Sequence, residues 1–197
     1  MIAIVDYGAG NLASVVKAIQ HLGRECVVSH DPDVVGHAEK WVIPGVGNFR
    51  ATAPLANGKL GTVLRDGVTS GQTPLLGICL GLQWMFEGSS EAPELSGLSV
   101  FRGRCTRFSE VVKAPHVGWD SLAMIGESRL LTGIPSGVYV YFTHSYRAPL
   151  CTETVATCAY EGSFTAVAER RNLFGVQFHP EISGNLGMQI QENFCAL

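Results

Sequence analysis

The sequence predicts an α/β fold: an open, mostly parallel sheet flanked by helices, with antiparallel strands added at one side. Three observations support this fold class. Short unbroken apolar runs in the first half alternate with segments of helical periodicity, and the second half contains closely spaced strand-like runs. The 197 residues are 46% hydrophobic and only 16% charged, against about 25% charged in average domains. A chain this apolar can bury a sizeable core.

The first strand and helix are the clearest elements. Residues 2–5 read Ile-Ala-Ile-Val, an unbroken apolar run typical of a parallel strand covered on both faces. Apolar residues then recur at one-turn intervals from Leu12 to Leu22, which predicts an amphipathic helix. Asn11 is placed to cap its start, and Gly23 to end it.

The next elements continue the alternation. Residues 27–28 and 41–43 predict a second and a third strand, and the third stops at Pro44. Residues 51–70 are expected to be mainly helical, and residues 74–78 form a further strand. Strands that alternate with helices in this way predict right-handed crossovers and a parallel sheet.

The second half predicts shorter strands with tight connections. A hairpin turn is expected near residues 171–172, and Ser183 is placed to cap a final helix. Residues 87–96 are polar and predict a surface loop. With no internal repeat and no second composition class, residues 1–197 are expected to form a single domain. The expected strands are residues 98–108, 138–142, 154–160 and 164–178.

Charge and cysteine usage exclude several functional classes. The net charge is −3 with no basic stripe, so neither nucleic acid nor a membrane surface is an expected partner. No apolar run approaches the ~18–20 residues that span a bilayer. The six cysteines lie far apart, and no His, Cys, Asp or Glu group has metal-ligand spacing, so no metal is expected. Together with an N-terminus that lacks signal-peptide features, these patterns predict a cytoplasmic protein with reduced thiols.

The segment around Cys79 predicts a nucleophile. Residues 75–78 form a buried strand that runs into Gly77-x-Cys79-x-Gly81 and then into a helical pattern. This is the thiol counterpart of the Gly-x-Ser-x-Gly elbow, whose sharp turn leaves no room for side chains two residues before and after the nucleophile. Such a turn places the thiol at a helix N-terminus, which favours thiolate. The alternative is a buried cysteine in a glycine-rich joint.

His179 is the best placed of six histidines to serve as the base. It follows the apolar run 174–178 and precedes Pro180-Glu181. The residue before a proline favours extended geometry, so His179 and Glu181 are expected to project to the same side. A carboxylate there would orient the imidazole and stabilise its charged form. The alternative is a histidine that closes a strand beside a surface glutamate.

These two segments carry a family resemblance. Residues 77–83, Gly-Ile-Cys-Leu-Gly-Leu-Gln, and residues 177–181, Gln-Phe-His-Pro-Glu, resemble the two diagnostic motifs of the class I, triad-type glutamine amidotransferases. Four further stretches resemble the branch of that family that serves histidine biosynthesis, and the resemblance runs from Met1 to the final helix. These stretches are residues 6–12, 44–49, 115–119 and 141–146.

The resemblance implies a reaction and a partner. Cys79 would attack the side-chain amide of L-glutamine, His179 would relay protons, and Glu181 would hold His179. The released ammonia would pass to a separate (β/α)8-barrel cyclase subunit, in a heterodimer. That subunit would make imidazole glycerol phosphate and aminoimidazole carboxamide ribotide. The family implies no cofactor, and residues 6–10 lack the glycine spacing and lysine of a phosphate loop.

The resemblance also assigns further residues. Val46 and Leu80 would supply the oxyanion N–H groups, and Asn11 and Trp119 would lie at the partner interface. The alternatives are a plain glycine-rich turn at residues 45–47, an exposed helical Gln83 and a core Trp119. The residues that the resemblance places around the glutamine substrate are Gly47, Gln83, Ser145 and Tyr146.

Three positions depart from the family pattern. The common Gly-Met-Gln reads Gly-Leu82-Gln, Gly-Trp-Asn reads Gly-Trp-Asp120, and His-Pro-Glu-Lys-Ser reads His-Pro-Glu-Ile182-Ser. Asp120 adds a charge near the expected interface, and Ile182 cannot form the ion pair open to a lysine. Two alternative functions follow: a paralogous glutaminase subunit that feeds another ammonia acceptor, or a non-catalytic scaffold partner.

Overall fold

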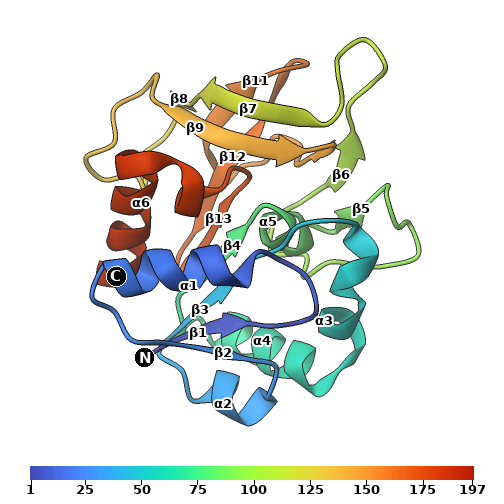
Figure 1. The fold of residues 1–197 in the computed structure, drawn as a ribbon. Helices are drawn as coiled ribbons and strands as arrows, with labels where there is room; N and C mark the ends of the chain where they lie inside the picture. Colours follow the sequence, from blue (N-terminus) through green and yellow to red (C-terminus); the bar gives the residue numbers. More distant parts are fainter.

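The computed structural model describes residues 1–197 and is built around one eight-stranded sheet (Figure 1). Strands β2, β1, β3, β4 and β13 are parallel neighbours in that order, and β12, β11 and β8 extend the sheet in antiparallel fashion. The predicted fold class is therefore confirmed. The bounds of these strands are β1 Ile2–Val5, β2 Cys26–Ser29, β3 Lys40–Ile43, β4 Leu75–Ile78, β8 Ala123–Met124, β11 Thr154–Ala159, β12 Ser163–Arg170 and β13 Leu173–Val176.

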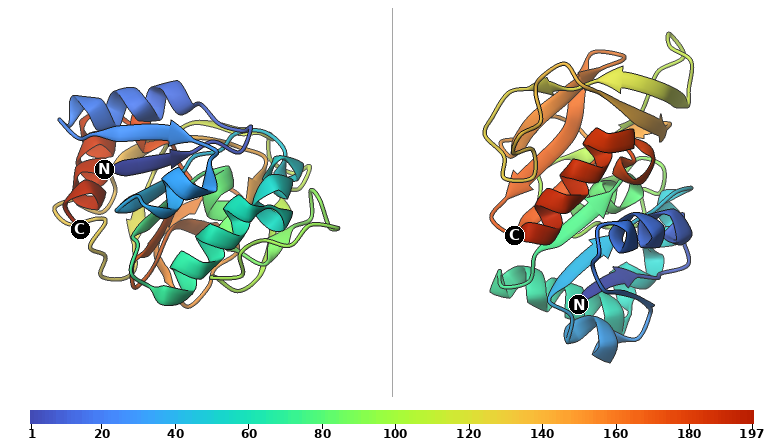
Figure 2. Two further views of the ribbon diagram at one scale, coloured as in Figure 1. Left: turned by 90° about the horizontal axis from the view of Figure 1, so that it is seen from below. Right: turned by 60° about the vertical axis from the view of Figure 1, so that its left-hand side comes forward.

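Helices cover both faces of the sheet. Side chains alternate along β1, so Ile4 joins one buried apolar cluster and Val5 joins the other. Helices α1 (Leu12–His21) and α6 (Gly184–Ala196) pack on the first cluster. Figure 2 shows this pair on one side of the sheet and the other helices opposite. The opposite helices are α2 Pro32–Gly36, α3 Ala53–Asn57, α4 Lys59–Ser70 and α5 Leu80–Met85.

Two smaller sheets lie beside the antiparallel end. Strands β7 (His116–Ser121) and β9 (Tyr139–His144) form an antiparallel ribbon, and Phe142 of this ribbon packs against Phe164 of β12. The ribbon runs across the upper part of the molecule in Figure 1. The second small sheet joins β10 (Tyr146–Arg147), β6 (Arg104–Arg107) and β5 (Gly88–Ser89).

The predicted helix at residues 51–70 is interrupted. A 3-10 turn (Phe49–Thr52), α3 and α4 follow one another, and the break falls at Gly58, whose backbone is extended. The Gly58 N–H donates to the Pro54 carbonyl, and a Cβ at Gly58 would lie 2.9 Å from that oxygen. The break therefore depends on glycine.

Several other expectations were wrong in detail. Ser183 makes no capping bond, because its hydroxyl donates to the His179 carbonyl at 2.6 Å and accepts from Tyr141 N–H at 3.0 Å. Of the expected strand 98–108, residues 104–107 alone form one, and the loop 87–96 contains the short β5. Strand β7 was not predicted, because its strand-forming residues Val117 and Trp119 stand among a glycine and three polar residues and give little strand signal. None of the helices combines the length and apolar character needed to cross a bilayer.

Lys40 joins the start of β3 to the C-terminus of α6. Its Nζ donates to the carbonyls of Phe194, Cys195 and Leu197 at 3.2, 2.6 and 3.2 Å. A cation at this end of a helix satisfies carbonyls that the helix leaves unpaired and complements its dipole.

We predict that Lys40→Met lowers the free energy of unfolding by about 1–3 kcal/mol, the range for hydrogen bonds that involve a charged group. Chemical denaturation measures the change. Lys17→Met, on the exposed side of α1, serves as the matched control. Equal free energies of unfolding for the two variants would contradict a stabilising role for the hydrogen bonds from Lys40 to α6.

Candidate functional site

The turn at Cys79 joins β4 to α5 in a conformation that side chains rarely adopt. Cys79 has φ +53° and ψ −102°, and its N–H donates to the Val176 carbonyl at 2.8 Å. A Cβ on Gly77 would lie 2.7 Å from the Gly81 carbonyl carbon, and one on Gly81 would overlap the Ile43 carbonyl oxygen. Both glycines are therefore required by close backbone approach, which is the reason that the sequence pattern suggested.

His179 and Glu181 lie together, as their spacing predicted. His179 Nδ1 lies 2.8 Å from Glu181 Oε1, and both side chains are almost completely buried. The carboxylate accepts the Nδ1 proton, so a neutral His179 presents an unprotonated Nε2. That atom makes no hydrogen bond within the chain. The pair is thus arranged to receive a proton at Nε2.

The Cys79 thiol lies at one end of a hydrogen-bonded row. Its Sγ donates to the Thr143 carbonyl at 3.9 Å and accepts from Gln177 Nε2 at 3.6 Å. Gln83 Nε2 in turn donates to the Tyr146 carbonyl at 2.8 Å and to Gln177 Oε1 at 3.3 Å. A carbonyl can only accept, so Tyr146 fixes the orientation of both amides and directs the Gln177 amide N–H to the sulfur.

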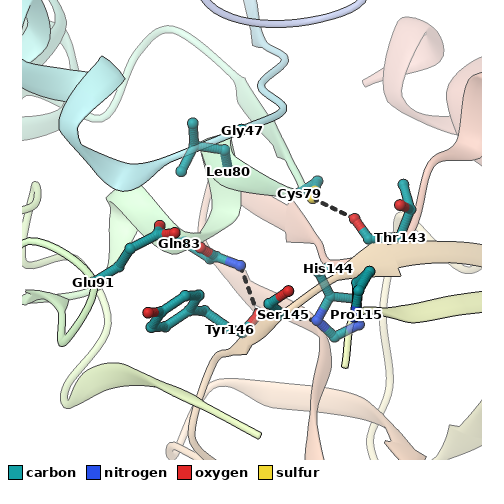
Figure 3. Close-up of a pocket in the computed structure, with 10 residues that line it drawn as sticks. All are labelled: Gly47, Cys79, Leu80, Gln83, Glu91, Pro115, Thr143, His144, Ser145 and Tyr146. Carbon is teal, nitrogen blue, oxygen red and sulfur yellow. Dashed lines mark hydrogen bonds between the residues drawn. The ribbon is translucent and has the colours of Figure 1, made fainter. Parts of the chain in front are cut away.

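A cavity of about 270 Å³ opens in front of this thiol (Figure 3). Each of the four residues predicted to bind the substrate lines it, together with Cys79 and Leu80. Gln83 is 4% exposed, so the alternative of a solvated helical glutamine was wrong. The remaining lining residues are Glu91, Pro115, Thr143 and His144.

The two predicted oxyanion donors are not assembled. The Leu80 N–H donates to the Gly45 carbonyl at 3.2 Å, and Val46 points partly outward with 39% exposure. Gly45 has no room for a side chain, because the Tyr7 hydroxyl and the Leu80 side chain occupy that space. Gly47, by contrast, has φ +97° and open space around it. In the segment after β3, Gly45 is therefore tightly packed, whereas Gly47 has no neighbouring atoms that restrict its backbone.

The two predicted interface residues lie outside the cavity. Asn11 is exposed and caps α1, where its side chain accepts from Ser14 N–H at 3.4 Å. Trp119 is 54% exposed on β7, so it is not a core residue, and it contacts Tyr141 edge-on. Val117 and Tyr139 are also more than half exposed on the same ribbon. No group of three or more His, Cys, Asp or Glu side chains is arranged to hold a metal ion.

Comparison with known proteins identifies the family. Residues 3–196 match the family "Glutamine amidotransferase class-I". The chain is 47% identical over its full length to the full-length "Imidazole glycerol phosphate synthase subunit HisH" of Thermococcus kodakarensis. The chain belongs to the class-I glutamine amidotransferases.

Further relatives and solved structures agree with this membership. The amidotransferase is 43% identical to the HisH subunit of Geobacillus kaustophilus, with 100% of this chain and 97% of that one covered. It is 41% identical to that of Archaeoglobus fulgidus, with 98% and 97% covered. A crystal structure of a glutamine amidotransferase shares the fold with TM-score 0.79 at 16% identity, covering 100% and 98% of the chains. The glutaminase domain of Trypanosoma brucei CTPS with bound acivicin gives 0.69 at 16% identity, covering 99% and 92%.

Electrostatics separate Cys79 from the other thiols of the amidotransferase. Burial opposes the charge on His179, but Cys79 and Glu181 outweigh it and raise the His179 pKa from 6.5 to about 10. A protonated His179 beside the sulfur favours thiolate. Burial raises the pKa of every other cysteine, to about 12 for Cys158. The others whose pKa is raised are Cys26, Cys105, Cys151 and Cys195.

Five residues of the amidotransferase site were not singled out by sequence reasoning: Glu91, Pro115, Thr143, His144 and Gln177. Gln177 belongs to the motif that contains His179, and its i, i+2 spacing on an extended segment was the available signal. Glu91 lies in the loop 87–96, whose polar composition gave no hint of a cavity. Thr143 contributes a backbone carbonyl, which any residue could supply.

We predict that iodoacetamide at pH 7 labels Cys79 first, and that Glu181→Gln slows this labelling. Loss of the carboxylate lowers the His179 pKa, so less imidazolium–thiolate pair forms at neutral pH. A drop of one pKa unit in His179 lowers the equilibrium constant for the imidazolium–thiolate pair about tenfold. Mass spectrometry of the labelled peptide follows the reaction. Glu192→Gln, exposed on α6, is the charge-matched control and should label at the unaltered rate.

Proposed function

We propose that this chain is the glutamine-hydrolysing subunit of imidazole glycerol phosphate synthase in L-histidine biosynthesis. The observation that carries the proposal is the cavity lined by Cys79, in a chain that matches curated HisH subunits over its full length. Cys79 is the member of the proposed Cys-His-Glu triad that lines the cavity. His179, whose pKa the thiol helps to raise, and Glu181 would complete the triad from behind the lining thiol. The substrate is L-glutamine, and the products of this chain are glutamate and ammonia.

The triad geometry supports a two-step acyl transfer. His179 Nε2 takes the Cys79 proton, and the thiolate attacks the amide carbon of glutamine to form a tetrahedral intermediate. The same proton then goes to the leaving nitrogen, which departs as ammonia and leaves a glutamyl thioester. Water, deprotonated by His179, cleaves the thioester to glutamate and restores the thiol. Glu181 holds Nδ1–H throughout and stabilises the imidazolium.

Oxyanion stabilisation requires a rearrangement at residues 45–46. Leu80 N–H and Val46 N–H are the proposed donors, but Leu80 N–H is held by the Gly45 carbonyl. Rotation of the Gly45–Val46 peptide would release Leu80 and turn Val46 N–H towards the cavity, and the open surroundings of Gly47 allow it. Partner and nucleotide binding would favour the rotated state, so the isolated chain has low activity.

The cavity lining supplies groups for each part of glutamine. Gly47, Gln83, Ser145 and Tyr146 surround the amino-acid end, largely through backbone atoms. Glu91 adds a carboxylate whose Oε2 accepts from Phe49 N–H at 2.7 Å, which fixes the group at the cavity wall. A carboxylate so placed can pair with the α-ammonium of the substrate.

The partner is proposed to be a separate (β/α)8-barrel cyclase subunit that converts the ammonia. The subunit names of the relatives imply a second subunit in the synthase. The exposed Trp119 and Asn11 support docking on the ribbon β7–β9 and the start of α1. Ile182 is 43% exposed and offers an apolar contact rather than an ion pair. We further propose that the chain works as one domain in the cytoplasm, where its six free cysteines stay reduced.

Glutamate release tests the proposal. We predict slow hydrolysis by this chain alone and a rise of several orders of magnitude with the barrel cyclase and its ribotide substrate. Cys79→Ala should abolish glutamate release in every mixture. Synthesis supported by added ammonia should survive in the Cys79→Ala complex, because ammonia bypasses the triad.

Other outcomes would redirect the assignment. Hydrolysis that does not respond to this partner would point to a paralogous subunit with another acceptor. A folded chain without activity in any mixture would point to the scaffold alternative. Loss of the ammonia-supported reaction in Cys79→Ala would mean that Cys79 is structural.

We predict that Glu91→Gln raises the KM for glutamine about 10-fold or more and changes kcat less, because a charge-assisted contact to the substrate is lost. Steady-state kinetics of the complex measure both. Glu94→Gln is the matched control, since Glu94 lies in the same loop but pairs with Arg50 at 2.8 Å. Equal KM values for the two variants would contradict the role of Glu91.

A further inference from the structure

A second row of polar side chains reaches the glutamine cavity from the opposite side to the triad. Asp120 and His116 point inward from β7, and His144 points inward from β9. His116 is 4% exposed and His144 6%, so both imidazoles are shielded from water. The roles proposed above use neither histidine. Buried polar groups of this kind must be satisfied by the groups around them.

The three side chains lie in contact along a line that ends at the cavity wall. Asp120 Oδ2 lies 3.4 Å from His116 Nε2, and His116 Nδ1 lies 3.3 Å from His144 Nε2. His144 Nδ1 lies 2.9 Å from the Tyr146 carbonyl, which also accepts from Gln83. The row therefore shares the Tyr146 carbonyl oxygen with the Gln83 amide. Gln83 in turn contacts the Gln177 amide, which reaches Cys79.

Counting protons shows what this row requires. Its two ends, the Asp120 carboxylate and the Tyr146 carbonyl, are acceptors, and two imidazoles lie between them. Three contacts between these four groups need three protons, whereas two neutral imidazoles carry two. The row is complete only with a third proton, and the form that pairs a cation directly with the Asp120 carboxylate has both protons on His116. Without that proton, two lone pairs face each other at one contact.

We propose that Asp120, His116 and His144 form a proton-dependent positioning unit for glutamine capture, resting on the glutaminase function proposed above. The protonated unit holds the Tyr146 carbonyl and, through it, Gln83 at the substrate end of the cavity. Loss of one proton breaks a contact in the row and loosens this wall. The three are positioning residues, since none of them touches the reacting atoms.

The surroundings favour a titration of His116 below the ordinary imidazole pKa of 6.5. Burial lowers the pKa of His116, and Asp120 opposes this shift. Burial also lowers the pKa of His144, to about 3, so His144 stays neutral and His116 is the group that gains the proton. The rings of Phe142 and Tyr160 stack on His116 with centroids 5.0 and 4.0 Å away and exclude water.

The other ionisable groups that face the row are held by their own partners or by burial. Tyr160 donates its hydroxyl to the Lys113 carbonyl. Arg147, which faces His144, is paired with Glu161. Cys158 faces the Asp120 carboxylate, and burial together with that carboxylate raises the pKa of Cys158 to about 12. His179, which lies on the side of His144, has a pKa raised to about 10 by Cys79 and Glu181. The proton of the Asp120–His116 pair is therefore the one that we expect to be lost as pH rises through the lowered pKa of His116.

The test compares the wild-type chain with Asp120→Asn. An amide at position 120 can donate to the unprotonated Nε2 of a neutral His116, so the row is complete without the extra proton. In the wild-type complex we expect the KM for glutamine to rise about 2- to 10-fold as pH rises from about 5 to 7, through the lowered pKa of His116, the equivalent of one net hydrogen bond. In Asp120→Asn this rise should disappear. Asp66→Asn, exposed on α4, should behave as wild type.

A second variant and a direct readout keep the proposal independent of the assay. His144→Phe breaks the row between its two ends, so it should raise KM, and adding Asp120→Asn should then change nothing further.

Long-range ¹H–¹⁵N spectra of the free chain report the protonation of each imidazole without any catalysis. We expect His116 to gain its second proton as pH falls in the wild type but not in Asp120→Asn. A His116 that stays neutral in the wild type, or parallel KM profiles for wild type and Asp120→Asn, would overturn the proposal. If neither the wild type nor any variant hydrolyses glutamine, the proposed glutaminase function is rejected. The spectra still show whether the protonation of His116 depends on Asp120.

Discussion

The arrangement of this molecule depends on how closely three backbone segments approach one another around Cys79. The end of β4, the start of α5 and the segment after β3 meet where Gly77, Gly81 and Gly45 leave no space for a Cβ. This contact forces Cys79 to a positive φ and places its thiol at the mouth of the cavity. The strain of such a conformation, of order 1–3 kcal/mol, is tolerated because the packing around it fixes the backbone. The same contact brings the Gly45 carbonyl to the Leu80 N–H. The position of the Cys79 thiol and the hydrogen bond that occupies the Leu80 N–H therefore have one origin.

The sequence predicted the parts of the structure that local chemistry determines. The strand–turn–helix at Cys79 and the pairing of His179 with Glu181 followed from glycine spacing and from the restriction before Pro180, and both are present. The parallel core followed from the alternation of apolar runs with helical periodicity. In each case the signal lay within a few neighbouring residues.

The parts that were missed depend on contacts between distant segments. Strand β7 exists because it pairs with β9, since the two strand-forming residues Val117 and Trp119, separated by Gly118, give only a weak signal by themselves. Ser183 has the composition of a helix cap, but the His179 carbonyl and Tyr141 N–H engage its hydroxyl. The bond from the Leu80 N–H to the Gly45 carbonyl could not be predicted either, since it joins residues 35 positions apart in the sequence.

The place of β13 in the sheet has a consequence for how the chain folds. This strand is the last in sequence, yet it lies between β4 and β12 and supplies the segment that bears His179. Until residue 176 has left the ribosome, the inner edge of β4 is unpaired and the two parts of the sheet have no common neighbour. Pairings between such distant segments form slowly, and unpaired edges invite association with other chains. The nascent chain therefore carries the Cys79 thiol 100 residues before it carries His179, so the two groups meet only after β13 has been made.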